Sequence, residues 1–115
     1  MAKIKHIEIA GNDGGKLQSF YGELFEWSIT RRNIQGFDYY DIEVGGEPTA
    51  GIRHEPEGKP EITIYVEVKE LDKSVEKAKS LGATVRIPPK EYGDLQFAVI
   101  ADPEGNPIGL IQEKN

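Results

Sequence analysis

The chain contains no cysteine, and this absence excludes several classes of protein at once. Disulfide scaffolds, thiolate metal centres and cysteine nucleophiles all need a residue that none of the 115 positions supplies. Long apolar runs are missing too, since the longest, residues 97–101, is far shorter than the roughly 20 residues of a membrane-crossing helix. No apolar stretch follows Lys3 and Lys5, so the sequence predicts a cytoplasmic protein with no secretory signal and no membrane partner.

Basic residues are in the minority, 14 against 20 acidic ones, which gives a formal charge of −6. A nucleic-acid binder needs a basic stripe, because neutralising phosphate charge supplies most of the affinity. The only adjacent basic pair is Arg31–Arg32, so no nucleic-acid partner is expected. Glycine-rich phosphate-binding motifs and the Gly-x-Ser-x-Gly motif are also lacking, which leaves dinucleotide binding and serine hydrolysis without support.

The first half of the chain reads as one strand, one helix and three further strands. Apolar residues from Leu17 to Phe25 follow the i, i+3, i+4, i+7, i+8 spacing of a helix face packed on a core, which includes Phe20, Tyr21 and Leu24. The turn at residues 12–15 precedes this helix and offers Asn or Asp as its cap. Strands are expected at residues 3–10, 27–32, 37–44 and 49–53.

The second half repeats this order. A strand is expected at residues 61–68, a helix at 71–81 ending before Gly82, and strands at 83–87, 95–101 and 107–112. Shifting the sequence by 57 positions places Ile7 on Ile64, and shifting by 59 places Pro48 on Pro107. The pattern predicts one domain over residues 1–115, built from two βαβββ modules at 1–57 and 58–115. The loop at residues 88–94 is a candidate lid.

The alternation of side chains along the strands predicts two different sheet faces. One face carries apolar residues beneath the helices, and the other carries His6, Glu8, Thr63 and Tyr65. Tyr39 joins the second face because its neighbour Tyr40 suits the helix side. Two twisted sheets placed side by side then form a curled mixed-sheet cup with helices on its outer face, which is an α+β fold with a cavity suited to a ligand.

At this point the residues match a known family. The repeated βαβββ order, Phe20–Tyr21 on the first helix, and the Asp-Pro-Glu-Gly-Asn-Pro turn at residues 102–107 resemble the vicinal oxygen chelate superfamily. That superfamily includes glyoxalase I, bleomycin-resistance proteins and extradiol dioxygenases. The resemblance covers essentially the whole chain, and the turn is its most specific part.

The resemblance implies a divalent metal held by four side chains, two from each module, which would chelate neighbouring substrate oxygens. Carried onto this sequence, those positions fall on His6, Thr63, Gly109 and, near the end of the first module, Ala50. Glycine and alanine offer no donor atom, and a threonine hydroxyl is a poor substitute for an imidazole. The family metal site is therefore incomplete, and no metal cofactor is expected.

The sequence thus predicts a protein that binds a small, partly aromatic or apolar organic molecule without metal. The expected ligand-binding residues share the inner face of the cup: His6, Glu8, Tyr39, Thr63, Tyr65 and Ile111. A homodimer is expected from the resemblance and from the open sheet edges.

Three alternatives remain open. The first is a metal-dependent lyase, isomerase or dioxygenase that combines His6 with Glu8 and His54. The second is metal-free proton transfer by Glu8 and His6. The third is an interaction module whose cavity is filled by its own side chains.

Overall fold

The computed structural model describes residues 1–114, and over this range the chain forms two helices and eight strands. Their order is strand, helix and three strands, twice over, as the sequence predicts. No helix in the described part is long and apolar enough to cross a membrane. The elements are β1 (Lys3–Gly11), α1 (Gly14–Phe25), β2 (Ser28–Ile34), β3 (Phe37–Glu43), β4 (Thr49–His54), β5 (Glu61–Val68), α2 (Leu71–Ser80), β6 (Thr84–Tyr92), β7 (Leu95–Ala101) and β8 (Pro107–Gln112).

Contacts divide the chain into two compact units. The N-terminal unit comprises residues 6–62, and the C-terminal unit comprises residues 1–5 with the chain from Thr63 onward. This division falls close to the predicted module boundary, and the single-domain organisation stays a prediction. Each unit contains one helix and a four-stranded mixed sheet, which establishes the α+β class.

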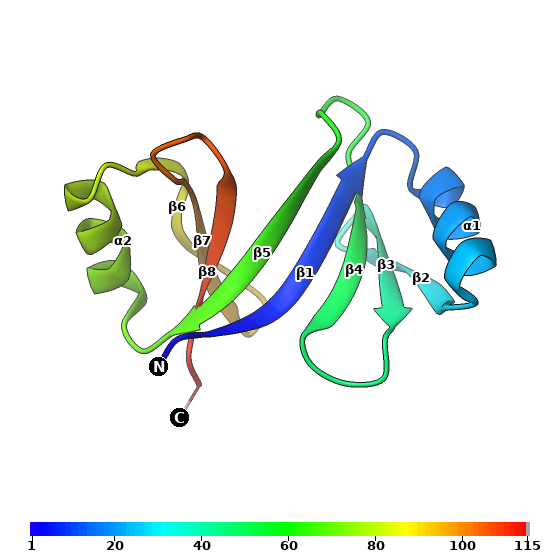
Figure 1. The fold of residues 1–115 in the computed structure, drawn as a ribbon, viewed down its shortest axis with the longest axis horizontal. Coiled ribbons are helices and arrows are strands. Elements are labelled where there is room, and N and C mark those ends of the chain that lie inside the picture. Colours follow the sequence, from blue (N-terminus) through cyan, green and yellow to red (C-terminus); the bar gives the residue numbers. More distant parts are fainter. Residues whose placement is uncertain (115) are drawn as a thin grey trace. The chain divides into compact units, whose positions relative to one another are not determined.

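The N-terminal unit has the strand order β2-β3-β4-β1, with β1 parallel to β4 and the other pairs antiparallel. Helix α1 packs along one face of this sheet (Figure 1). The core beneath it consists of Tyr40, Ile42 and Ile52, with Trp27 and Tyr21 packed against them. These strand residues alternate with Tyr39 and its same-face neighbours, so the predicted assignment of Tyr40 to the helix side is confirmed.

The C-terminal unit repeats the arrangement with the strand order β5-β8-β7-β6, in which β5 is parallel to β8. Helix α2 covers one face (Figure 1). The core of this unit is wholly apolar, and the helix and sheet supply it together: Leu71, Val75, Ala98, Ile100 and Leu110. Burial of these aliphatic side chains supplies the main favourable term that holds the unit together.

Local hydrogen bonds fix the ends of these elements as the sequence predicts. The Asp13 carboxylate accepts from the backbone N–H of Lys16 at 3.0 Å and caps α1. Gly82 follows α2 with φ 104°, in the left-handed region that glycine tolerates best. In the turn between β7 and β8, Asp102 accepts from the backbone N–H groups of Glu104 and Asn106, both at 2.9 Å. Hydrogen bonds, foremost from Asn106, lower the pKa of Asp102 and keep it an acceptor.

The expectation that the whole apolar stripe of α1 belongs to the core is wrong. Tyr21 packs against the core, but Phe20, Leu24 and Phe25 are 55%, 57% and 50% exposed. The apolar stripe of α1 is wider than the face of the helix that contacts the sheet. Trp27, from the segment after the helix, takes up part of the space against the core.

The expected loop at residues 88–94, the candidate lid, is wrong for residues 88–92, which belong to β6. Strand β6 continues through Pro88 and Pro89 to Tyr92, and Lys90 and Tyr92 pair with Phe97 and Leu95 of β7. Two register shifts accommodate this stretch. Proline is tolerated in such bulged strands at a sheet edge, where no neighbouring strand needs its missing N–H.

Candidate functional site

A continuous chain of hydrogen bonds runs across the face of the N-terminal unit opposite α1. His6 Nδ1 lies 2.7 Å from Thr49 Oγ1, and His6 Nε2 lies 2.7 Å from the Tyr39 hydroxyl. That hydroxyl donates to Glu8 Oε2 at 3.0 Å, and Arg53 Nη1 donates to Glu8 Oε1 at 2.7 Å. We call Thr49, His6, Tyr39, Glu8 and Arg53 the polar cluster.

The chemistry of these groups fixes the direction of each hydrogen bond. Glu8, as a carboxylate ion-paired with Arg53, only accepts, so Tyr39 gives it the single phenolic proton. The Tyr39 oxygen then accepts from His6, which places the imidazole proton on Nε2. Nδ1 of neutral His6 therefore accepts from the Thr49 hydroxyl. The cluster thus forms one aligned chain of donors and acceptors, an arrangement in which neighbouring hydrogen bonds strengthen one another.

Burial lowers the pKa of His6 below its ordinary value of 6.5, while the nearby charges of Glu8 and Asp41 act in the opposite direction. Desolvation dominates because the cationic imidazolium loses more hydration than the neutral ring does. Neutral His6 is therefore the favoured form in the folded protein.

The shift of His6 predicts a dependence of stability on pH. The unfolded chain binds the proton near pH 6.5 and the folded chain only at lower pH, so acidification favours unfolding between these two pKa values. We expect the stability of the wild type relative to His6→Gln to be constant above about pH 7 and to fall as the pH drops below about 6.5. Urea unfolding of both proteins between about pH 5 and 8 measures this difference, and a difference that does not change with pH contradicts the assignment.

Arg53 lies among three carboxylates of the N-terminal unit. Besides Glu8, its guanidinium approaches Glu55 Oε2 at 3.2 Å and Glu61 Oε2 at 3.6 Å, and its side chain is 30% exposed. Sequence reasoning missed Arg53 and Thr49. Both lie on β4 at alternate positions with Gly51 between them, so the period-two rule applied to β4 would have placed them on the face of Tyr39.

The strand register corrects one of the predicted metal-ligand positions. Gly51 pairs with Glu8 and Asp41 as Gly109 pairs with Tyr65 and Val99, so Gly51 is the counterpart of Gly109. The predicted counterpart, Ala50, packs against the core on the helix side and is wrong. The site therefore has glycine at both positions, and neither provides a donor atom.

A tyrosine ring covers each of these glycines. A Cβ atom at Gly51 would overlap the ring of Tyr39, and a Cβ at Gly109 would overlap the ring of Tyr65. At these two positions, to which the resemblance assigns metal ligands, this chain has aromatic rings packed onto the backbone.

The C-terminal unit places its three predicted residues on the sheet face opposite α2. Tyr65 and Thr63 are 8% and 3% exposed, and Ile111 is half-buried. Ile111 alternates with Gly109 along β8 and pairs with Phe97 of β7. This face combines apolar and aromatic side chains with Thr63 and with Glu67, which pairs with Ile111, whereas the matching face of the N-terminal unit carries the polar cluster.

The structure thus brings His6, Glu8 and Tyr39 into direct contact within the N-terminal unit. It places Thr63, Tyr65 and Ile111 on one face of the C-terminal unit. That the six bind one ligand in a shared cavity stays a prediction.

The alternative metal set of His6, Glu8 and His54 is wrong. His54 pairs with Gly11 and His6 with Thr49, so the two histidines are separated by five positions along the β1–β4 pair, about 16 Å. His54 is half-buried rather than exposed, and its Nδ1 accepts from the backbone N–H of Gly14 at 2.9 Å. Within residues 1–114 no three His, Asp or Glu side chains are grouped to hold a metal ion.

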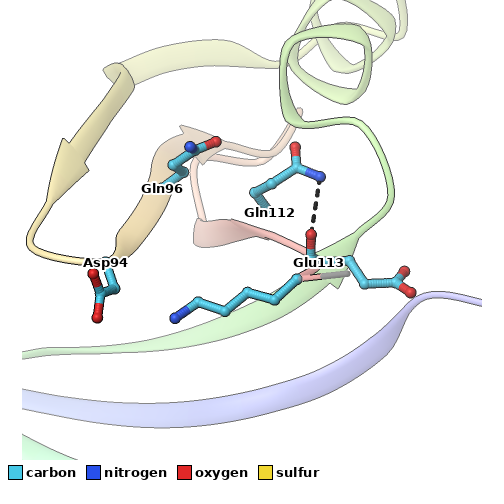
Figure 2. Close-up of a pocket in the computed structure, with 5 residues that line it drawn as sticks. Asp94, Gln96, Gln112 and Glu113 are labelled. Atoms are coloured by element: carbon cyan, nitrogen blue, oxygen red, sulfur yellow. Dashed lines mark hydrogen bonds between the residues drawn. The ribbon is translucent and has the colours of Figure 1, made fainter.

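Two surface depressions lie in the C-terminal unit. The larger has a volume of about 590 Å³ and is lined by Asp94, Gln96, Gln112, Glu113 and Lys114 (Figure 2). The smaller, about 190 Å³, shares Gln96 and Gln112 with it. The Gln112 amide is already engaged: it accepts from Leu71 N and donates to the backbone oxygens of Lys69 and Glu113, the latter bond being visible in Figure 2. None of the six predicted residues lines either depression.

Two strand–helix–three-strand units, each with a mixed four-stranded sheet, give the chain the fold of the vicinal oxygen chelate superfamily. The sequence profile described as "Glyoxalase-like domain" matches residues 6–111. The chain belongs to this glyoxalase-like domain family.

Solved structures share the fold at low sequence identity. A hypothetical protein from Bacillus halodurans C-125 has a TM-score of 0.74 and 17% identity, covering 99% of this chain and 96% of that one. Methylmalonyl-CoA epimerase from Mycobacterium tuberculosis has a TM-score of 0.66 and 16% identity, covering 97% and 88%. A Streptomyces coelicolor epimerase variant in complex with 2-nitronate-propionyl-CoA has a TM-score of 0.71 and 14% identity, covering 98% of both chains. No curated protein sequence matches significantly.

Proposed function

We propose that this chain is a cytoplasmic, metal-independent binding protein for a small, partly aromatic or apolar organic molecule. The observation that carries the proposal is the tyrosine ring over the glycine at each of two family metal-ligand positions, Tyr39 over Gly51 and Tyr65 over Gly109. The glycines provide no metal donor, and the tyrosine rings over them, above all the half-buried Tyr39, suit contact with a planar or apolar ligand.

The polar cluster supports binding over proton transfer. A general base needs a lone pair that can reach a substrate proton. Here one Glu8 oxygen accepts from Tyr39 and the other from Arg53, and both His6 nitrogens have partners. The cluster orients the Tyr39 ring through its hydroxyl, and its charged pair provides a polar anchor for a ligand heteroatom.

The ligand class is inferred from the sheet face of each unit taken by itself and from the neighbouring structures. The C-terminal unit contributes Tyr65, Phe97 and Ile111, with the carboxylate residue Glu67 paired with Ile111 on the same face. Solved structures of this fold include epimerases in complex with CoA esters, which are small organic ligands. For this chain we propose a small ligand with aromatic or apolar character, and we do not propose a particular compound.

The test uses 1-anilinonaphthalene-8-sulfonate, a planar aromatic probe, added to ¹⁵N-labelled protein. We expect saturable shifts of the amide signals of His6, Tyr39, Tyr65 and Ile111, with binding weakened roughly tenfold in Tyr65→Leu. Phe37→Ser, which removes an aromatic ring that is 65% exposed on the β2–β3 hairpin, is the matched control and leaves the shifts unchanged. Shifts confined to Gln96 and Gln112 in the surface depressions overturn the proposed site.

Metal dependence is tested separately. The purified protein is dialysed against nickel, zinc, iron or manganese, and the bound metal per chain is measured. We expect no stoichiometric metal, because glycine occupies the expected ligand position on the last strand of each module, Gly51 on β4 and Gly109 on β8. One tightly bound ion per chain that is lost in His6→Ala would favour a metal-dependent lyase, isomerase or dioxygenase.

The proposal includes a homodimer. Strands β2 and β6 are edge strands, and an edge strand can pair with a strand of a second chain.

A further inference from the structure

In each unit, one side chain at the end of the last strand holds the start of the helix. In the N-terminal unit, His54 Nδ1 accepts from the backbone N–H of Gly14, the first residue of α1, at 2.9 Å. In the C-terminal unit, Gln112 Oε1 accepts from the backbone N–H of Leu71, the first residue of α2, at 2.8 Å. We call these two hydrogen bonds the α1 latch and the α2 latch.

The two latches occupy equivalent places in the repeat. His54 ends β4 and pairs with Gly11 of β1, while Gln112 ends β8 and pairs with Val68 of β5, and both pairs are parallel. In each unit the residue after the latch donates its backbone N–H to the carbonyl oxygen of that same strand partner, at 2.8 Å and 2.7 Å. The latches therefore differ only in their chemistry: an imidazole takes up a proton between about pH 8 and 5, and an amide does not.

The α1 latch requires the neutral form of His54. The first N–H groups of a helix have no acceptor within the helix, so the Gly14 N–H depends on the imidazole. Gly14 is buried, and a Cβ atom there would overlap the ring of Tyr40, so an N–H without an acceptor at this place is costly. A protonated imidazole carries N–H groups at both nitrogens and cannot accept, and its charge is repelled by the positive end of the helix dipole.

Charged residues surround the α1 latch on α1, on β2 to β4 and in the segment after β4: Asp13, Lys16, Arg31, Asp38, Arg53 and Glu55. The hydrogen bond from Arg31 lowers the pKa of Asp38 most, and the charge of His54 adds to this effect. Asp38 therefore stays ionised over the whole range in which histidine titrates. A protonated His54 thus has an anionic neighbour on β3, while it no longer accepts from α1.

We propose that the α1 latch is an acid-sensitive switch, in which protonation of His54 releases the start of α1 from β4 while the α2 latch holds. The proton binds Nδ1, and the lone pair that accepted from the Gly14 N–H becomes an N–H bond. Acid then loosens one module of the repeat and leaves the other fastened. This inference goes beyond the proposed ligand binding and does not depend on it.

The test is amide hydrogen exchange of Gly14 and Leu71 in the full-length His6→Gln variant, whose single histidine is His54. Dividing the exchange rate of an unfolded chain at each pH by the measured rate gives a protection factor. We expect the protection of Gly14 to fall roughly tenfold between about pH 8 and 5, because its acceptor is lost, and that of Leu71 to stay constant. Protection of Gly14 that does not change, or that falls in step with Leu71, overturns the proposal.

The ¹⁵N signal of His54 Nδ1, followed in the same samples, links the loss to the proton. We expect this signal and the protection of Gly14 to change with the same midpoint. Different midpoints overturn the proposal, and this comparison needs no change at either latch.

Exchanging the latch side chains provides matched controls, with far-UV circular dichroism at pH 8 to show that each variant folds. His54→Gln keeps an acceptor that cannot be protonated, so the protection of Gly14 should no longer depend on pH. Gln112→His should transfer the acid sensitivity to Leu71, because it places a titratable acceptor at the α2 latch. A loss of Gly14 protection in acid that persists in His54→Gln overturns the proposal, since another group must then cause it.

Discussion

Replacing Arg53 with leucine is expected to lower the free energy of unfolding by about 3 kcal/mol, because it removes the charged partner of a buried carboxylate. The Glu8 side chain is only 9% exposed, and Arg53 Nη1 contacts its Oε1 at 2.7 Å. Without the guanidinium, Glu8 keeps the hydrogen bond from Tyr39 but loses the compensating charge. Leucine fills part of the volume of the arginine stem, so the decrease in unfolding free energy reports the missing charge more than the missing packing.

Urea unfolding at neutral pH measures this effect, with two further variants as controls. Arg31→Leu breaks an exposed pair with Asp38, in which the arginine side chain is 61% exposed, and should leave stability unchanged. Glu8→Gln in the Arg53→Leu background removes the stranded charge and should recover part of the loss. If Arg53→Leu is no more harmful than Arg31→Leu, the Glu8 ion pair does not stabilise the fold.

The order of elements was predicted well because it rests on two local signals, the spacing of apolar residues within an element and the turn residues between elements. The strands at residues 61–68, 95–101 and 107–112 have the predicted bounds, since β-branched runs between strong turn residues leave little freedom. Strand β6 extends past its predicted end because pairing with β7 overrides the two prolines. Pairing of that kind depends on residues distant in sequence, and no local pattern records it.

For the candidate site, the sequence predicted only which residues of a single strand share a sheet face, because side chains alternate between the two faces. Parity along β1 and β3 placed His6, Glu8 and Tyr39 on one face, where they contact each other. The register between strands is not a local property, and a slip of one residue exchanges the two faces. The prediction of Ala50 came from the repeat offset of 59 residues that aligns Pro48 with Pro107, whereas the strand pairs align Gly51 with Gly109.

Replacing Gly109 with alanine is expected to lower the free energy of unfolding by about 2–3 kcal/mol. The added Cβ overlaps the ring of Tyr65, which is 8% exposed and has little room to move. The ring and the β8 backbone must therefore separate, which disturbs the paired positions of Tyr65 and Gly109 in the β5–β8 ladder. A larger side chain at position 109 meets the same ring.

A double-mutant cycle with Tyr65→Ala, followed by urea unfolding, assigns this loss to the ring. With the ring removed, Gly109→Ala should cost less than about 0.5 kcal/mol, because the new methyl group enters open space. Gly22→Ala is the matched control: its Cβ would lie 3.6 Å from the nearest atom outside the helix, the Trp27 carbonyl oxygen, and alanine is favoured in a helix. That variant should gain about 0.5–1 kcal/mol, opposite in sign to Gly109→Ala. Equal effects at both glycines would mean that the Tyr65 ring yields freely, and the space at position 109 would then be open to a metal-binding side chain.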